Sequence, residues 1–168
     1  NILQPGPGVG GHCIAVDPWF IVDSAPDQAR LIRLAREVND HKPEWVIEKV
    51  QQAIAQVHES YPARTRRDVR VACFGAAFKP NIDDLRESPA LRIIRAIAKL
   101  GCQVMVVEPN VKKLPTDLDN GYVHLVGIDR ALDTADVVCV LVRHTPFMEH
   151  QESFRKAYHL VDTVGLVQ

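Results

Sequence analysis

Residues 6–17 combine a glycine-rich run with a thiol and a carboxylate. The run GPGVGG at residues 6–11 is followed closely by Cys13, and Asp17 lies four residues further along. If the segment after Cys13 forms a helical turn, this spacing puts both side chains on one face. A cysteine thiolate is a nucleophile and a carboxylate can move protons, so the segment has the residue types of a covalent active-site loop. A structural cysteine in a loop is the alternative, because no base is identified beside Cys13.

The glycine-rich run also matches the dinucleotide-binding pattern G-x-G-x-x-G through Gly6, Gly8 and Gly11. We reject this match because the pattern works only between a strand and the N-terminus of a helix. Only residues 1–5 precede it, and Pro7 lies inside the turn. A motif so close to the first residue leads us to expect that the chain is a piece of a longer protein.

A second group of charged residues lies in the run GAAFKPNIDDLRESPA at residues 75–90. It places Lys79 and Arg86 after an expected strand and before a helix whose start is signalled by Ser88 and Pro89. Loops at the carboxyl ends of parallel strands bind ligands, and helix N-termini favour phosphate. The alternative is a surface loop held by ion pairs, because three acidic residues are interleaved with the two cations.

Residues 27–59 have a helical pattern with two apolar stripes. The first stripe consists of Leu31, Leu34, Ala35 and Val38, and the second of Val46, Val50, Ala53, Ile54 and Val57. Pro43 divides them, so either a kinked long helix or two abutting helices fits. Two stripes exceed what one small sheet domain can cover, so we expect a homodimer through residues 27–59. Charged replacements of Val50 and Ile54 are expected to dissociate it.

The rest of the chain alternates between strand and helix patterns after a polar, basic linker at residues 61–68. The expected strands lie at residues 69–76, 103–107, 122–126, 137–142 and 160–162, and the expected helices at residues 88–101 and 128–134. Such alternation predicts an α/β fold, a Rossmann-like parallel sheet with helices on both faces, preceded by the long helical dimerisation segment. We expect two units: residues 1–66, with the active-site loop and helical segment, and residues 67–168, with the sheet.

Composition and charge exclude several classes of function. The net charge of −1 leaves no electrostatic footprint for nucleic acid or an anionic membrane surface. No apolar run approaches the roughly 18 to 20 residues of a membrane span. The four cysteines form no C-x-x-C pair, which favours a reducing, cytoplasmic location. The histidines are scattered without ligand spacing, so we expect no metal site.

Two blocks of the sequence together resemble the UDP-glucose/GDP-mannose dehydrogenase family. The first is GxGxGGxC at residues 6–13 followed by an Asp-Pro pair, and the second is GxxFKxxxxDxRES at residues 75–88, with AREVND at residues 35–40 between them. The resemblance implies an NAD-dependent oxidation of a sugar C6 alcohol to a carboxylate, through a cysteine thiohemiacetal and a thioester. It assigns Cys13 as the nucleophile and Asp17 as the carboxylate that assists hydrolysis and proton transfer.

The same resemblance implies how the ligands are held. Gly10 matches a backbone contact to the sugar, where a side chain would collide with the ligand. Phe78 and Lys79 match contacts to the UDP-sugar, with Lys79 as a point charge for the diphosphate. Arg86 matches a cation that reaches NAD on another domain. Because that NAD-binding domain is absent, we expect the chain alone to be inactive.

The continuation GGHCIAVDPWFI resembles the branch of the family that oxidises UDP-N-acetylhexosamines, and most closely its mannosamine enzymes. One departure is Val164, which stands where the family commonly has a basic residue, so a cation that would help to hold the phosphates is missing at that corner. The alternatives are a dehydrogenase of another nucleotide sugar, such as UDP-GlcNAc, UDP-GalNAc or UDP-glucose, or a non-catalytic module that binds UDP-sugar or dimerises. A thiol-dependent hydrolase or transferase is the weakest, because no histidine is placed to activate Cys13.

Overall fold

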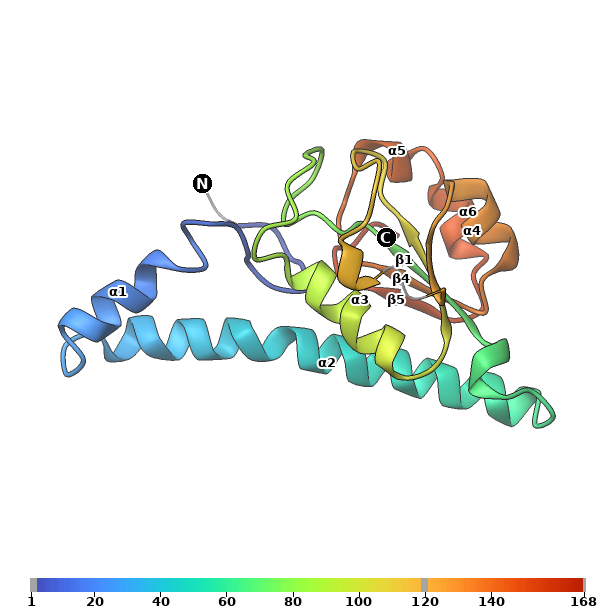
Figure 1. Ribbon diagram of the computed structural model, residues 1–168, viewed down its shortest axis with the longest axis horizontal. Helices are drawn as coiled ribbons and strands as arrows, with labels where there is room; N and C mark the ends of the chain where they lie inside the picture. The colour runs from blue at the N-terminus through green and yellow to red at the C-terminus, as the bar shows by residue number, and fades with distance from the viewer. Residues whose placement is uncertain (1–2, 119–120, 168) are drawn as a thin grey trace.

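The computed structural model describes residues 3–118 and 121–167 (Figure 1). Its helices are α1 (Asp17–Ser24), α2 (Arg30–Ser60), α3 (Pro89–Lys99), α4 (Ile128–Thr134), α5 (Thr145–Met148) and α6 (Gln151–Arg155), with short 3₁₀ turns η1 (Arg66–Asp68) and η2 (Thr116–Leu118). Its strands are β1 (Arg70–Phe74), β2 (Gln103–Val107), β3 (Val123–Leu125), β4 (Val137–Val140) and β5 (Leu160–Asp162). In the described residues no helix is long and apolar enough to cross a membrane.

The five strands form one parallel sheet in the order β3-β2-β1-β4-β5. The chain first builds outward from β1 through β2 to β3, and then returns to place β4 and β5 on the other side of β1. The direction of winding therefore reverses between β1 and β4, and such a switch point is where doubly wound sheets bind ligands. The predicted Rossmann-like sheet is confirmed, and β2, β5 and α4 have the predicted bounds.

Strands β1 and β4 each end two residues earlier than the sequence pattern predicts. After Phe74, the amides of Ala76 and Ala77 donate to the side chain of Glu108 instead of to a neighbouring strand. After Val140, the next two amides both donate to the carbonyl of Phe74. The apolar runs continue past these points because the residues are still buried, so burial alone does not mark where a strand ends.

Each face of the sheet has its own apolar core. One core joins the sheet to α2 and α3, and the other joins it to α4, α5 and α6. Three phenylalanines, Phe74, Phe147 and Phe154, pack edge to face in the second core. The short helices α5 and α6 and the helix α1 were not predicted, because segments this short show too little periodicity to be recognised.

Helix α2 is one continuous helix of 31 residues with Pro43 inside it. Its second half packs on the sheet: Val50 is 0% exposed and belongs to the first core. Val50 and Ile54, for which charged replacements were expected to dissociate a dimer, are both buried within this chain, so they present no surface to a partner. The first half of α2 projects beyond the sheet and pairs with α1, and we call residues 17–42 the arm (Figure 1).

Helix α3 begins and ends as predicted. Its N-cap Ser88 accepts a hydrogen bond from the amide of Leu91, Pro89 is the first helical residue, and Gly101 beyond the end has a φ of +83°. The hydroxyl of Ser88 also donates to the carbonyl of Ala76 at 2.6 Å. The cap therefore fixes the start of α3 to the end of β1.

Residues 61–68, predicted to be a linker, are tied to the sheet. Arg64 donates two hydrogen bonds to the carboxylate of Asp136, and that carboxylate also accepts from the amide of Arg70 at the start of β1. Burial acts to raise the pKa of Asp136, but the hydrogen bonds and charges of the two arginines outweigh it and lower the pKa.

Candidate functional site

A cavity of about 400 Å³ lies at the carboxyl edge of the sheet, at the switch point between β1 and β4. One wall is the glycine-rich segment, and the others are the residues that follow β1 and β4. Three of the sequence-predicted residues, Gly10, Phe78 and Lys79, line it together. Further lining comes from Leu141, Val142, Arg143 and Val164. The structure thus brings residues far apart in the sequence to one cavity of the size that small ligands occupy.

Phe78 is the point where the glycine loop meets the loop after β1. A Cβ on Gly11 would come within 2.9 Å of the Phe78 ring, and the φ of Gly11 is +90°. A side chain at position 11 would therefore be strained and would displace the ring. The ammonium of the exposed Lys79 lies 5.7 Å from the centre of the same ring, so aromatic and cation stand side by side at the cavity.

Gly10 is constrained by the protein itself. A Cβ there would lie 2.2 Å from the carbonyl oxygen of Glu87 and 2.6 Å from Cδ of Pro89. The loop can therefore lie against the start of α3 only with glycine at this position. A close approach of the sugar to Gly10 stays a prediction.

Cys13 and Asp17 lie one helical turn apart, at the start of α1. The carbonyl of Cys13 accepts hydrogen bonds from the amides of Val16 and Asp17, at 3.0 and 2.8 Å. Cys13 is exposed and Asp17 is exposed. Neither lines the 400 Å³ cavity, so they stand beside it on the same loop.

Arg86 forms an ion pair with Asp84, with 2.6 Å between the closest atoms. The hydrogen bonds from Arg86 lower the pKa of Asp84 to about 2, and the charge of His12 contributes in the same direction. The pKa of Arg86 is raised, first by Asp84 and to a smaller extent by Cys13. The ion-pair alternative for this loop is thus correct for Arg86, and the same cation is electrostatically coupled to the candidate nucleophile.

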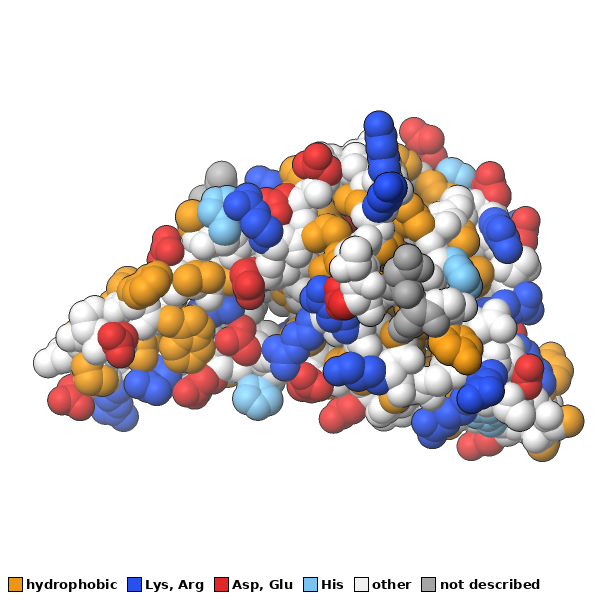
Figure 2. Space-filling view, viewed as in Figure 1, with side chains coloured by type: hydrophobic (Ala, Val, Ile, Leu, Met, Phe, Trp, Pro, Cys, Tyr) orange, Lys and Arg blue, Asp and Glu red, His pale blue; other side chains and the backbone are white. Residues whose placement is uncertain are grey.

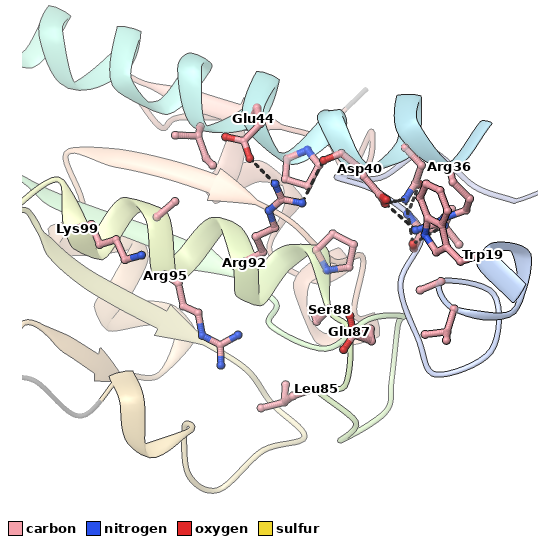
Figure 3. Close-up of a pocket in the computed structure, with 18 residues that line it drawn as sticks. Trp19, Arg36, Asp40, Glu44, Leu85, Glu87, Ser88, Arg92, Arg95 and Lys99 are labelled. Atoms are coloured by element: carbon pink, nitrogen blue, oxygen red, sulfur yellow. Dashed lines mark hydrogen bonds and ion pairs between the residues drawn. The ribbon is translucent and has the colours of Figure 1, made fainter. Parts of the chain in front are cut away.

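Helix α2 holds the glycine loop through Asn39. Its amide oxygen accepts from the Val9 amide at 2.7 Å, and its amide nitrogen donates to the Val9 carbonyl at 3.2 Å. The neighbouring Arg36 is buried, pairs with Asp40 at 2.6 Å and points toward the carbonyls of Val9 and Ile14 (Figure 3). Sequence reasoning found AREVND only as part of a resemblance, because its contacts are with residues about thirty positions away.

A second cavity, of about 670 Å³, lies between the arm, α2 and α3 (Figure 3). Its lining, within the described part of the chain, includes none of the six sequence-predicted residues. Arg92 crosses it to reach Glu44 at 2.6 Å and the carbonyl of Asp40 at 3.1 Å. This cavity is larger, but it is spanned by contacts that join two helices, so we place the candidate site in the smaller one.

Sequence reasoning also missed a buried pair, Glu108 and His144. Glu108 follows β2, His144 lies four residues after β4, and their side chains meet at 3.0 Å with no exposure of either side chain. Burial acts to raise the pKa of Glu108, but hydrogen bonds from His144 and from the amides of Ala76 and Asn110 outweigh it and lower the pKa. The sequence signal was weak, because it consists of a single acidic residue after one strand and a single histidine after a different strand.

The described residues do not fit a dinucleotide. Gly6, Gly8 and Gly11 lie between no strand and helix start, since α1 begins only at Asp17. At the first strand, the amides that could meet a phosphate already donate to Glu108. The described chain also contains no group of three or more His, Cys, Asp or Glu side chains that could hold a metal ion.

The turn after β5 is held by hydrogen bonds within the chain. The carboxylate of Asp162 accepts from the amides of Val164 and Val167, at 3.0 and 2.9 Å. Val164 is buried and gives the cavity an apolar wall at the position where the family commonly has a basic residue.

The sequence matches two family models and many known proteins. Residues 72–168 match the UDP-glucose/GDP-mannose dehydrogenase family, UDP binding domain, and residues 1–41 match the central domain of that family. Over 99% of this chain it is 54% identical to a UDP-N-acetyl-D-mannosamine dehydrogenase of Salmonella typhi, and 52% identical to an NDP-N-acetyl-D-galactosaminuronic acid dehydrogenase of Ralstonia solanacearum. It spans 39% and 37% of those proteins.

Solved structures agree. A UDP-N-acetyl-mannosamine dehydrogenase from S. aureus, 34% identical, superposes with a TM-score of 0.72 over 100% of this chain and 37% of its own. A related dehydrogenase from Pyrococcus horikoshii, 26% identical, gives a TM-score of 0.76 over 100% of this chain and 38% of its own. With the UDP binding domain model covering more than half of its residues, and with the glycine–cysteine loop beside the sheet, the chain belongs to the UDP-glucose/GDP-mannose dehydrogenase family.

Proposed function

We propose that this chain binds the UDP part of a nucleotide sugar and supplies the thiol nucleophile that forms the covalent intermediate, as part of an NAD-dependent UDP-N-acetylmannosamine 6-dehydrogenase. The product is UDP-N-acetylmannosaminuronate. The observation that carries the proposal is the 400 Å³ cavity at the switch point, where Gly10, Phe78 and Lys79 meet and Cys13 lies on the same loop. The relatives named above support the sugar class.

The chemical steps assigned to this chain are addition and hydrolysis. The Cys13 thiolate adds to the C6 aldehyde and gives a thiohemiacetal, and after oxidation of that adduct a water molecule cleaves the thioester. Asp17 takes a proton from this water, and the carboxylate product leaves while the thiol is restored. Both oxidations need a hydride acceptor that the described residues do not bind. NAD is therefore assigned to another domain, Arg86 to a contact with it, and the chain alone is expected to be inactive.

The division of the chain into two units also suggests how two copies assemble. We propose that residues 1–66 supply the active-site loop and the dimerisation segment, and that residues 67–168 form the UDP-sugar-binding unit. The homodimer forms through the segment of residues 27–59, on the part of α2 that the sheet leaves uncovered. A cytoplasmic location fits four cysteines that are free thiols.

Calorimetry with UDP and with NAD tests the binding proposal. We expect weak binding of UDP, because Lys79 and the cavity are present, and hardly any binding of NAD, because no dinucleotide site is formed. Lys79→Met keeps the length of the side chain and removes its charge, and should reduce the affinity for UDP about tenfold. Tight binding of NAD without binding of UDP would overturn the assignment.

Another nucleotide sugar is the second candidate. It is favoured by the 52% identity to the galactosaminuronic acid dehydrogenase, which nearly equals the 54% identity to the mannosamine enzyme. Comparison of kcat/KM for UDP-N-acetylmannosamine, UDP-GlcNAc, UDP-GalNAc and UDP-glucose, in the enzyme that joins this chain to an NAD-binding domain, separates them. If none of the four is oxidised, the chain is a non-catalytic binding or dimerisation module.

A further inference from the structure

The segment of residues 76–81 carries Phe78 and Lys79 between β1 and α3. It has no strand or helix hydrogen bonds of its own, and Asn81 has a φ of +60°, a left-handed conformation that is uncommon for a residue other than glycine. Such a segment keeps one shape only if other groups hold it. The Ser88 hydroxyl holds the Ala76 carbonyl, and the Asp84 carbonyl accepts from the Phe78 amide at 3.2 Å. The amides at the two ends of the segment are held by Glu108 and His144, which do not line the cavity.

Glu108 holds the first end of the segment. Its Oε2 atom accepts from the amides of Ala76 and Ala77, at 2.8 and 3.1 Å, and its Oε1 atom accepts from the amide of Asn110 at 3.1 Å. The residue is 4% exposed. A buried carboxylate that accepts several amide hydrogens is an internal anion, and it satisfies donors that would otherwise be left without partners.

His144 holds the other end. The amide of Asn81 donates to Nδ1 of His144 at 2.9 Å, so Nδ1 carries no proton. The proton is then on Nε2, which lies 3.0 Å from Oε2 of Glu108 and donates to it. The ring is 0% exposed and links the Asn81 amide directly to the carboxylate.

The side chain of Asn81 adds a second attachment at this end. Its amide nitrogen donates to Oγ1 of Thr145, and its amide oxygen accepts from the Thr145 amide, both at 2.9 Å. The residues between the two attached ends are Phe78, Lys79 and Pro80, and all three line the cavity. Loss of the attachments would therefore act on the cavity wall.

We infer that Glu108 and His144 are positioning residues, which hold residues 76–81 so that Phe78 and Lys79 face the nucleotide sugar. The inference rests on the proposed function for its ligand, and on the hydrogen bonds alone for its geometry. A charged group and a histidine buried in a core are weak evidence for stability, since apolar residues of the same size would serve as well. Their value here is that they fix the shape of a binding segment.

The test uses His144→Ala, His144→Asn and His144→Gln in this chain, with UDP as the ligand. The oxygen of an asparagine can take the place of Nδ1 and accept from Asn81, whereas a glutamine reaches Glu108 but offers Asn81 no acceptor there. Ile97→Ala, at the far end of α3 in the first core, is the matched control for a general loss of stability.

We expect His144→Ala to weaken UDP binding on the order of tenfold, the effect of losing one buried hydrogen bond. Hydrogen exchange at the Asn81 amide should rise in the alanine and glutamine variants and stay near that of the parent chain in the asparagine variant. Ile97→Ala should lower Tm and leave UDP affinity unchanged. The asparagine and glutamine variants keep the comparison usable if the alanine variant does not fold.

Two results decide separate questions. Unchanged exchange at Asn81 in His144→Gln, or unchanged UDP affinity in a folded His144→Ala, overturns the positioning role. Failure of the parent chain to bind UDP counts against the proposed function instead, and the exchange measurement at Asn81 then still confirms or overturns the attachment of the segment.

Discussion

Cys13 stands at the exposed end of the glycine loop, one turn before Asp17 and within the electrostatic reach of Arg86. If it is the nucleophile, Cys13→Ser removes the sulfur without changing the cavity, so binding of the nucleotide sugar should persist while formation of the uronic acid falls by several orders of magnitude. The assay follows acid formation in the enzyme that joins this chain to an NAD-binding domain. If the Cys13→Ser variant formed the acid at the parent rate, Cys13 would not be the nucleophile.

Asp17→Asn gives the complementary result in the same enzyme. The amide keeps the size of the side chain but cannot take a proton from water, so hydrolysis should slow and a thioester should accumulate. Mass spectrometry after mixing with UDP-N-acetylmannosamine and NAD⁺ should find an adduct on the peptide that contains Cys13. The double variant with Cys13→Ser is the control, because it has no sulfur to form the adduct.

The sequence predicted which residues share the cavity better than it predicted the contacts around each of them. Gly10, Phe78 and Lys79 do share one cavity, because the ends of parallel strands and the loop beside them must meet. The reason for glycine at position 10 could not be predicted, since the neighbour is the carbonyl of Glu87, a contact across 77 positions that depends on the packing of α3. Glu108 and His144 were missed for the same reason.

Asn39 connects helix α2 to the glycine loop, so a change at this residue tests how the helix positions the loop. Asn39→Ala removes two hydrogen bonds to the backbone of Val9, so exchange of the Val9 amide should rise and UDP affinity should fall about tenfold. His41→Ala is the matched control, since His41 is exposed on the same helix and its ring bonds the carbonyl of Glu37 in that helix. Equal effects of both replacements would contradict a specific role for Asn39.

The long elements were predictable and the short ones were not. Helix α3 has its start and end marked by Ser88, Pro89 and Gly101, and β2 needs only an apolar run between turns. Pro43 left open whether α2 is one helix, because proline costs a helix hydrogen bond but packing on the sheet can offset that loss. Helices of four and five residues, such as α5 and α6, depend on the core formed by Phe147 and Phe154.

For the whole molecule, the exposed apolar side chains of the arm predict self-association. Leu31 is 78% exposed and Phe20 is 68% exposed, and hydrophobic side chains gather over the arm in Figure 2. Leu34→Asp with Val38→Asp should therefore give a monomer without loss of Tm, measured by sedimentation and thermal unfolding. Val50→Asp is the contrasting variant, and it should unfold the chain because the site is buried. A parent chain that is monomeric at high micromolar concentration would contradict the proposed dimer.

The continuity of α2 has a mechanical consequence. At 1.5 Å per residue its 31 residues form a rod of about 46 Å, anchored in the first core by its second half. Asn39, near the middle of the rod, fixes the glycine loop, and the capped start of α3 fixes the same loop from the sheet side. The loop that carries the thiol and lines the cavity is therefore attached to both α2 and α3. If the proposed NAD-binding domain closes over the site, we therefore expect that domain to move while the glycine loop stays attached to α2 and α3, with the hinge outside α2.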